Sequence, residues 1–176
     1  MAKSPDRSKK RSVTAARSGR GHPPSLQVGA LCWRRSEKGL RILLITSRDT
    51  GRWVIPKGWP MRRRSEPEAA AREAWEEAGV QGEIGARSIG LFPYRKYLGP
   101  GRWIPCVVRV YPLEVGAQLK EYPEHDQRKV RWFAPAKAAK RLAEPELRAL
   151  IRDFDPDTDA IAGPDGPTRS DQTVDS

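Results

Sequence analysis

The chain has 176 residues and a formal net charge of +11, which is enough length for one domain with a hydrophobic core. No apolar run approaches the roughly 18–20 residues of a membrane span, and the N-terminus lacks the apolar stretch of a secretory signal, so we expect neither a membrane nor a secreted protein. Cys32 and Cys106 lie in apolar, strand-like runs and are expected to be buried reduced thiols, which favours a cytoplasmic location.

The charge is unevenly distributed along the chain. Residues 1–25 carry seven Lys/Arg against one Asp (+6), and residues 153–176 carry seven Asp against one Arg (−6), so the region 26–152 alone holds the full +11. The positive charge of residues 26–152 would attract a polyanionic ligand. The alternative is that these basic residues are simply solvated on the surface. Nucleic acid is a less favoured partner, because the sequence has no helix-turn-helix, RNA-recognition or zinc-finger pattern.

The first part of the chain is predicted to be a tail followed by strands. Residues 1–25 are poor in apolar side chains, which predicts a disordered basic tail, and their Arg/Ser-rich composition also fits a transit peptide. The apolar runs 27–35 and 40–47 are bounded by turn residues and are predicted to be strands. A turn at 49–51 precedes a short strand at 53–55, which leads into a loop.

A helix is predicted between Ser65 and Gly79, because both ends carry capping signals. Ser65 is a favourable N-cap, and Glu68 three residues later completes a capping box. Gly79 ends the helix, since glycine adopts the left-handed conformation of a C-terminal cap. The preceding loop is kept irregular by Pro56, Gly58 and Pro60.

The predicted helix has an apolar face and an acidic face. The apolar face is expected to pack inward and consists of Ala71, Ala74, Trp75 and Ala78. Glu73, Glu76 and Glu77 share the other face, where a hard divalent cation would relieve their mutual repulsion. Arg72 is placed to bridge to Glu76 or to Glu68 and to hold the acidic cluster in shape. The alternative for this pattern on its own is a solvated acidic surface.

The second half of the chain returns to strands and helices. We predict a strand or connector at 81–86, a β-hairpin with arms at 87–97 and 103–113, a polar loop at 116–127, a strand at 129–133, and helices at 135–142 and 146–154. Residues 155–176 are predicted to be a disordered acidic tail. This order indicates an α/β fold with a mixed β-sheet between helical layers, in one domain spanning 26–154.

The pattern around the helix resembles the signature of the Nudix hydrolases, Gly-x5-Glu-x7-Arg-Glu-U-x-Glu-Glu-x-Gly-U, where U is aliphatic. The positions that match in register are Gly58, Arg72, Glu73, Glu76, Glu77, Gly79 and Val80, with Ala74 at the first U. Arg64 stands where the signature has its first Glu, and Glu66 or Glu68 is a candidate to take its place. The resemblance covers roughly 26–152 and implies a Nudix α/β/α sandwich.

The resemblance also implies a reaction and its catalytic residues. It implies hydrolysis of a phosphoric anhydride with Mg²⁺, or alternatively Mn²⁺, as cofactor. Glu76 and Glu77 would be metal ligands, and Glu73 would be a further ligand or the general base. Arg72 belongs to the same catalytic set.

Further candidate residues flank the signature. A backbone carbonyl near Lys57 or Gly58 and a loop carboxylate from Glu121 or Glu124 are candidate metal ligands, although both glutamates could equally be ordinary loop residues. The Lys57 ammonium is a candidate phosphate contact, and otherwise a surface lysine at a strand end. The candidates to border the cleft and bind substrate are Arg62, Arg63 and Arg64, unless they are simply solvated.

The segment from Pro56 to Trp59, with Arg128, Trp132 and Phe133, is most similar to the diphosphoinositol polyphosphate and diadenosine polyphosphate phosphohydrolases of the family. We therefore expect a polyanionic small-molecule substrate. The alternatives are a nucleoside triphosphate sanitiser, an RNA 5′ pyrophosphohydrolase and a noncatalytic Nudix binding module. The intact glutamates of the signature argue against the last alternative.

Overall fold

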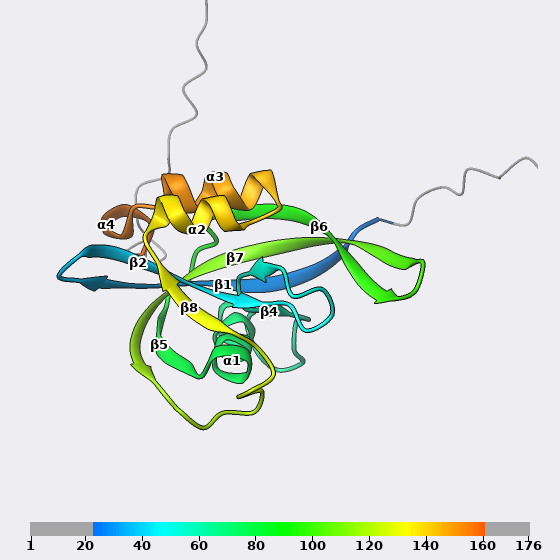
Figure 1. Cartoon of the computed structure of the whole chain (residues 1–176), viewed down its shortest axis with the longest axis horizontal. Coiled ribbons are helices and arrows are strands. Elements are labelled where there is room, and N and C mark those ends of the chain that lie inside the picture. The colour runs from blue at the N-terminus through cyan, green and yellow to red at the C-terminus, as the bar shows by residue number, and fades with distance from the viewer. Residues whose placement is uncertain (1–22, 161–176) are drawn as a thin grey trace, which may run out of the picture.

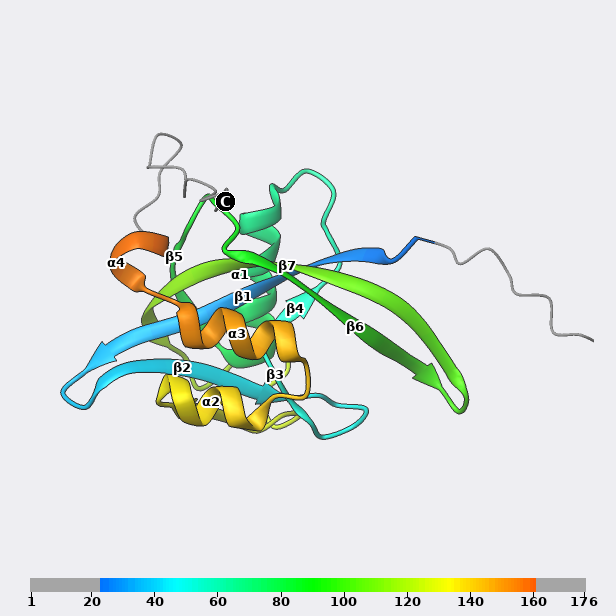
Figure 2. The same ribbon diagram turned by 90° about the horizontal axis from the view of Figure 1, so that it is seen from above.

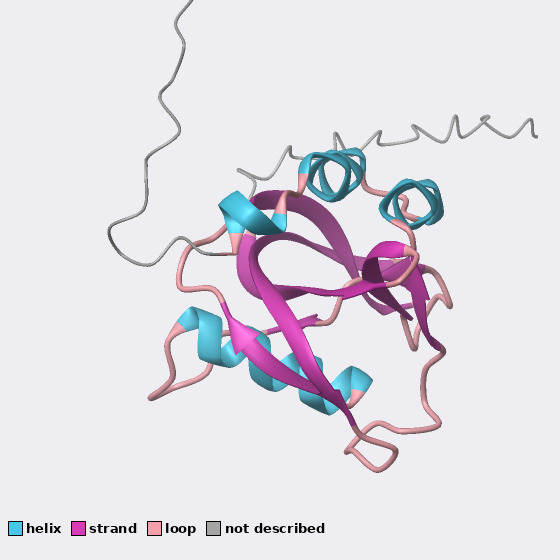
Figure 3. Ribbon diagram, turned by 90° about the vertical axis from the view of Figure 1, so that its left-hand side faces the viewer, coloured by secondary structure: helices cyan, strands magenta, loops and turns pink. Residues whose placement is uncertain are grey.

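A computed structural model describes residues 23–160 and shows a twisted sheet between two helical layers (Figure 1). The strands are β1 (Ser25–Ser36), β2 (Gly39–Thr46), β3 (Trp53–Val54), β4 (Lys57–Gly58), β5 (Val80–Ile84), β6 (Gly90–Gly99), β7 (Arg102–Gln118) and β8 (Val130–Phe133). The helices are α1 (Glu66–Ala78), α2 (Pro135–Arg141), α3 (Pro145–Asp153) and α4 (Pro156–Asp159). The predicted α/β/α sandwich is confirmed, with α1 on one face and α2 and α3 on the other (Figure 3).

The sheet is mixed, as the sequence predicts. Its main path runs β3-β2-β1-β7-β5, while β4 pairs with β1, β6 with β7, and β8 with β2. β1 and β7 run parallel, and the remaining pairs are antiparallel. The long β6–β7 hairpin extends beyond the helices and forms an arm beside the start of β1 (Figure 2). This arm forms one wall of the candidate site.

Each face of the sheet has its own hydrophobic core because side chains alternate along a strand. On β1, Leu31 and Trp33 pack toward α2 and α3, while Ala30 and Cys32 pack toward α1. Cys32 and Cys106 are both buried and free, which confirms the predicted thiols. The described residues contain no helix that is long and apolar enough to span a bilayer.

Helix α1 begins and ends where the sequence predicts. The Ser65 side chain accepts a hydrogen bond from the Glu68 backbone N–H, and the Glu68 carboxylate accepts from the Ser65 N–H at 2.7 Å, so the capping box is complete. Gly79 adopts φ 68° and donates its N–H to the Trp75 carbonyl. Because these signals are local, they fix the ends of the helix without help from distant residues.

The buried face of α1 differs from the predicted one. The fully buried alanines are Ala69, Ala70, Ala74 and Ala78. Ala71 and Trp75, which we expected to pack inward, are only partly buried, and Glu77, which we placed on the opposite, acidic face, is 8% exposed. The helix is therefore rotated on the sheet so that its acidic edge points into the protein rather than into solvent.

Two further expectations need correction. Lys57–Gly58, predicted as loop, forms the two-residue strand β4 against Val28 and Gly29 of β1. Residues 156–159, predicted to be disordered, form α4, and Asp157 of this helix pairs with Arg35 at 2.5 Å. The remaining parts of the predicted tails, residues 1–22 and 161–176, lie outside the described residues.

Gly79 provides a test of how tightly the end of α1 is packed. A Cβ at Gly79 would collide with the Tyr122 ring, whereas a Cβ at Gly51, which has nearly the same φ of 67°, meets nothing within 4 Å. We expect Gly51→Ala to cost only the left-handed backbone penalty of about 1–2 kcal/mol. Gly79→Ala should lower the free energy of unfolding, measured in urea, by clearly more. Equal losses for the two variants would show that Tyr122 does not pack on the helix end.

Candidate active site

The candidate site lies where α1, β4 and the loop between β7 and β8 meet. Gly58 lies directly against the Glu73 carboxylate, and a Cβ at this position would collide with that carboxylate. The Lys57 backbone N–H donates to Oε2 of Glu77 at 3.2 Å. A glycine is therefore required at this position of the signature, because the backbone passes in direct contact with the Glu73 carboxylate, a candidate catalytic group.

Arg128 is the main partner of the buried glutamate. Its Nη2 donates to Oε1 of Glu77 at 2.9 Å, its Nε donates to Oε2 of Glu124 at 2.8 Å, and its Nη1 donates to the Thr46 carbonyl at 3.1 Å. The Arg128 and Glu77 side chains are 8% and 10% exposed. A buried charge pair of this kind is stable only when the remaining donors and acceptors are also satisfied, and here each guanidinium nitrogen has a partner.

The loop between β7 and β8 is fastened to the end of α1. The Glu124 N–H donates to the Glu76 carbonyl at 3.0 Å, and the Leu119 N–H donates to the Gly79 carbonyl at 2.7 Å. These contacts bring Glu124 into the acidic neighbourhood, where its charge helps to raise the pKa of Glu73. Of the two loop carboxylates considered from the sequence, the structure brings Glu124 to the site and leaves Glu121 exposed.

Arg72 follows one of the two predicted pairings. Its Nε donates to Oε1 of Glu76 at 2.6 Å, while Glu68 is engaged in the capping box instead. The Arg72 guanidinium also lies over the partly buried Trp75 ring, 4.4 Å from its centroid. Arg72 therefore orients Glu76 from the solvent side of the helix.

Two of the glutamates hold protons far more tightly than an exposed carboxylate does. Burial raises the pKa of Glu73 to about 7, and repulsion from Glu76 and Glu124 adds to the effect. Burial also raises the pKa of Glu77 to about 7, against the opposing influence of Arg128 and Lys57. Positive charge from this chain therefore does not fully compensate the carboxylates around Glu73.

These residues fit a divalent cation of the Mg²⁺ type. The donor set is made of carboxylate oxygens, which hard cations prefer, and its negative charge is buried and incompletely neutralised. Within residues 23–160, no three acidic, histidine or cysteine side chains already converge at metal-binding separation. Glu76 and Glu77 are instead each paired with an arginine, Arg72 and Arg128 respectively.

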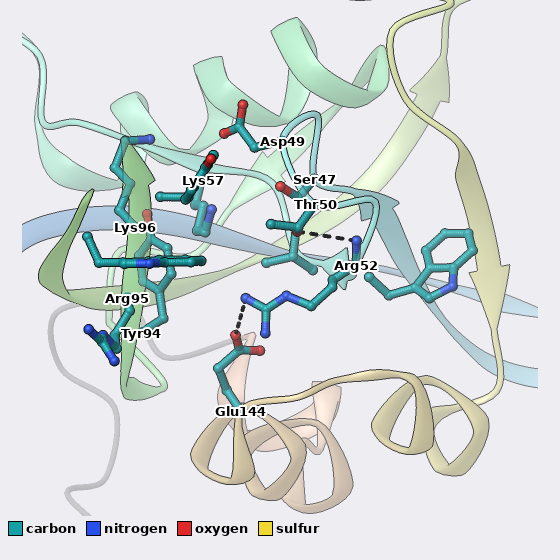
Figure 4. Close-up of a pocket in the computed structure, with 13 residues that line it drawn as sticks. Ser47, Asp49, Thr50, Arg52, Lys57, Tyr94, Arg95, Lys96 and Glu144 are labelled. Carbon is teal, nitrogen blue, oxygen red and sulfur yellow. Dashed lines mark hydrogen bonds and ion pairs between the residues drawn. The ribbon is translucent and has the colours of Figure 1, made fainter. Parts of the chain in front are cut away.

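A cleft with four cationic side chains opens next to Lys57, whose backbone N–H contacts Glu77 (Figure 4). The Lys57 ammonium lies over the Tyr94 ring at 4.5 Å, and burial lowers the pKa of this lysine while the Glu77 charge opposes the shift. The residues that line the cleft come mainly from the 47–54 segment and the β6–β7 arm, and its cationic members are Arg52, Lys57, Arg95 and Lys96. Lys57 thus lies next to Glu77, and its role as a phosphate contact stays a prediction.

The three consecutive arginines lie apart from this cleft. Arg62, Arg63 and Arg64 are exposed in the loop before α1, and none of them lines the Lys57 cleft. Arg64 instead borders a separate groove together with Arg72 and Trp75 on the outer side of α1. Of the three, Arg64 lines this groove, and that these arginines border the substrate cleft and bind substrate stays a prediction.

The two candidates for the missing first glutamate of the signature have other partners. Both oxygens of Glu66 accept from Nη1 of Arg109 at 2.8 Å, and Oε2 also accepts from the Tyr111 hydroxyl at 2.7 Å. Glu68 completes the capping box. Glu66 therefore fastens the start of α1 to β7, so the loop that contains Arg64 is held by a different residue from the one in the signature.

Several residues of the site had no signal in the sequence. In the sequence, Arg128 stands out only as part of a segment similar to relatives, while Tyr94, Arg52 and Glu144 belong to ordinary strand or loop patterns. The spacing of Arg128 four residues after Glu124 is the one local clue, because an i, i+4 pair joins them. Their convergence depends on the pairing of distant strands.

The comparisons with known proteins agree with this geometry. The family model described as NUDIX domain matches residues 25–154. The chain is 32% identical over 123 residues to Nudix hydrolase 16, mitochondrial, of Arabidopsis thaliana, a match that covers 68% of each protein. It is 31% identical over 123 residues to diphosphoinositol polyphosphate phosphohydrolase 2 of Rattus norvegicus, which covers 66% of this chain and 62% of the relative.

Solved structures share the fold. The MutT protein from Methanosarcina mazei is 26% identical, with a TM-score of 0.55 and coverage of 77% of this chain and 95% of that protein. The Ap4A hydrolase of C. elegans, at 19% identity, has a TM-score of 0.52 and coverage of 74% and 95%. With the family model matching most of the chain and the signature glutamates gathered at one site, the chain belongs to the Nudix hydrolase family of pyrophosphohydrolase enzymes.

Proposed function

We propose that this protein is a divalent-metal-dependent hydrolase that cleaves a phosphoric anhydride bond in a polyphosphorylated small molecule. The observation that carries the proposal is the acidic cluster of the partly buried Glu73 and the buried Glu77, which is joined through the Lys57 backbone N–H to the cleft that Lys57 lines. Such a cluster suits metal ions and the adjoining cleft suits phosphates. A binding module without catalysis would not require buried carboxylates of raised pKa next to the ligand cleft.

In this proposal Glu73, Glu76 and Glu77 hold Mg²⁺ or Mn²⁺, and Glu124 adds a carboxylate from the loop. The bound metal would neutralise phosphate oxygens and lower the pKa of the attacking water. Arg72 and Arg128 orient the carboxylates. Glu73 would alternatively be the general base that accepts the proton of the attacking water.

The proposed substrate class is a compound with several linked or clustered phosphates. Four cationic side chains line the same cleft, namely Lys57, Arg52, Arg95 and Lys96. Their combined charge favours ligands that carry several negative charges close together. The names of relatives support this class, because they include diphosphoinositol polyphosphate phosphohydrolases and an Ap4A hydrolase. We also propose a reducing compartment, which suits the two free thiols.

The catalytic assignment is tested by Glu77→Gln. Loss of a metal ligand should lower kcat by about 100-fold or more, since even the loss of an outer partner of a metal site costs 10–100-fold. The fold should be retained, because glutamine preserves the size of the side chain and Arg128 keeps its bonds to Glu124 and to the Thr46 carbonyl, and thermal unfolding checks this. Glu121→Gln is the matched control on the exposed loop, and its kcat should equal that of the wild type. Turnover by Glu77→Gln close to the wild-type rate at saturating Mg²⁺ would refute the assignment.

The substrate assignment is tested by kinetics with different phosphate numbers. We expect kcat/KM to be higher for a diadenosine or inositol polyphosphate with at least four phosphates than for a nucleoside triphosphate, and to fall as salt is added. Lys57→Ala should raise KM more for the more highly charged substrate, because it removes one cation from the cleft. A preference for nucleoside triphosphates that is insensitive to salt would favour the sanitising alternative and leave the metal site unaffected.

A further inference from the structure

The tip of the β1–β2 hairpin carries basic side chains that lie away from the candidate active site. Figure 2 shows this hairpin at the opposite end of the molecule from the β6–β7 arm. Arg34 on β1 is the cross-strand partner of Arg41 on β2. Because side chains alternate along a strand, both arginines share the sheet face of Cys32 and Leu43, which pack toward α1. Gly29 of β1 pairs with β4 at the active site, and Arg34 lies roughly 16 Å further along the strand.

Two facing arginines without a carboxylate partner are unfavourable and need a physical reason. Like charges directly opposite each other in an antiparallel sheet repel, because their Cβ atoms are only about 4.5–5.5 Å apart. Arg34 and Arg41 are both partly buried, and neither has an ion-pair partner among residues 23–160. Three other partly buried arginines each pair with a carboxylate, namely Arg72, Arg109 and Arg128. The facing pair at the hairpin tip therefore differs from them in lacking a counter-charge within the described part of the chain.

The guanidinium of Arg34 is held in place by the indole of Trp132. Its central carbon lies over the Trp132 ring, 4.0 Å from the ring centroid. The indole N–H donates to Oε1 of Gln118 at 3.0 Å, so the ring is itself fastened to the end of β7. A guanidinium that stacks on an aromatic ring keeps the N–H donors at its edge available. Arg34 can therefore bind an anion without first losing the freedom of its side chain.

The two arginines line one hollow at the hairpin tip, and its other walls are Ser36, Glu37, Lys38 and Trp132. The turn that carries Lys38 is fixed by the Ser36 hydroxyl, which donates to the Gly39 carbonyl at 3.0 Å and accepts from the Lys38 N–H at 3.2 Å. Glu37 is the one carboxylate of the hollow, and it is exposed. The cationic side chains of the hollow therefore outnumber its acidic side chain, and the hollow has a net positive charge.

From this arrangement we infer that the hairpin tip is a second anion site, which binds a phosphate group between Arg34, Lys38 and Arg41. A phosphate dianion has enough acceptor oxygens to take N–H donors from both guanidinium groups, and its charge offsets their repulsion. A carboxylate has only two oxygens, which one guanidinium already satisfies. The ligand is inorganic phosphate or the phosphate group of a small ester. Binding here needs neither metal nor turnover, so the inference is independent of the proposed function.

The binding test follows the indole N–H signal of Trp132 by heteronuclear NMR while sodium phosphate replaces sodium chloride at constant ionic strength in metal-free protein. This signal reports on the hairpin tip, because Trp132 lines the hollow there and not the Lys57 cleft, and Trp132→Phe identifies it. We expect a saturable shift in the wild type. Arg34→Gln and Arg41→Gln should each weaken Kd about tenfold or more, since each removes hydrogen bonds to a charged group.

Arg131→Gln is the matched control for the loss of one positive charge. Arg131 is exposed on β8, next to Trp132, and pairs with Leu44 on the opposite face of the sheet. Its Kd for phosphate should equal that of the wild type. The absence of a saturable shift in the wild type, or the same Kd in all of these proteins, would overturn the inference.

The same titration with methyl phosphate distinguishes the two sources of the phosphate group. Binding of methyl phosphate as tightly as inorganic phosphate would support a site for phosphate esters. Binding of inorganic phosphate alone would support a site for the free anion.

A stability measurement checks the repulsion between the two arginines. In phosphate-free buffer Arg41→Glu should raise Tm, because the new carboxylate faces Arg34 and replaces a like-charged pair by an opposite-charged one. Phosphate should raise the Tm of the wild type by more than that of Arg41→Glu, since ligand binding stabilises only a fold that retains the site. A lower Tm for Arg41→Glu than for the wild type without phosphate, or an equal gain from phosphate in both proteins, would contradict the inference.

Discussion

The site depends on one buried guanidinium. Arg128 connects α1 through Glu77, the following loop through Glu124, and β2 through the Thr46 carbonyl. A buried carboxylate without a partner is strongly destabilising, so Arg128 is what allows Glu77 to point into the protein at all. The same three bonds fix the loop that carries Glu124 to the end of the helix. Rotation of α1 toward the sheet and closure of the loop are thus consequences of a single charge-paired network.

The positive charge of Arg128 does not fully offset the burial of the Glu73 and Glu77 carboxylates, and this affects how the stability of the fold depends on pH. Glu73 and Glu77 both have pKa values raised from 4.5 to about 7. The folded protein therefore binds these protons more tightly than the unfolded chain does. Without metal, this contribution to stability is fully present below pH 4.5 and is lost as pH rises through 7. A divalent cation would replace the protons, so the same burial that weakens the metal-free fold at neutral pH would favour metal binding.

Local signals made much of the fold predictable. The ends of α1 follow from Ser65, Glu68 and Gly79, whose interactions lie within a few residues of one another. The β6–β7 hairpin follows from the Gly-Pro-Gly turn, although β7 continues to Gln118, beyond the predicted arm. The spacing of the signature also identified the glutamates. These features need no knowledge of which strands become neighbours.

Contacts between distant segments could not be predicted in the same way. The inward rotation of Glu77 depends on Arg128, which lies 51 residues further along the chain. The attachment of the start of α1 to β7 depends on Glu66 and its partner Arg109, 43 residues further along the chain. In both cases the deciding partner is far away in the sequence.

The most direct test of the account is calorimetric titration of Mg²⁺ into metal-free protein at neutral pH. The account predicts saturable binding to the wild type, weakened about tenfold or more in both Glu77→Gln and Glu124→Gln. Glu121→Gln, which changes an exposed carboxylate of the same loop, should bind Mg²⁺ as the wild type does. Absence of Mg²⁺ binding to the wild type, or equal affinity in all of these proteins, would contradict the central claim that this buried acidic cluster is a metal site.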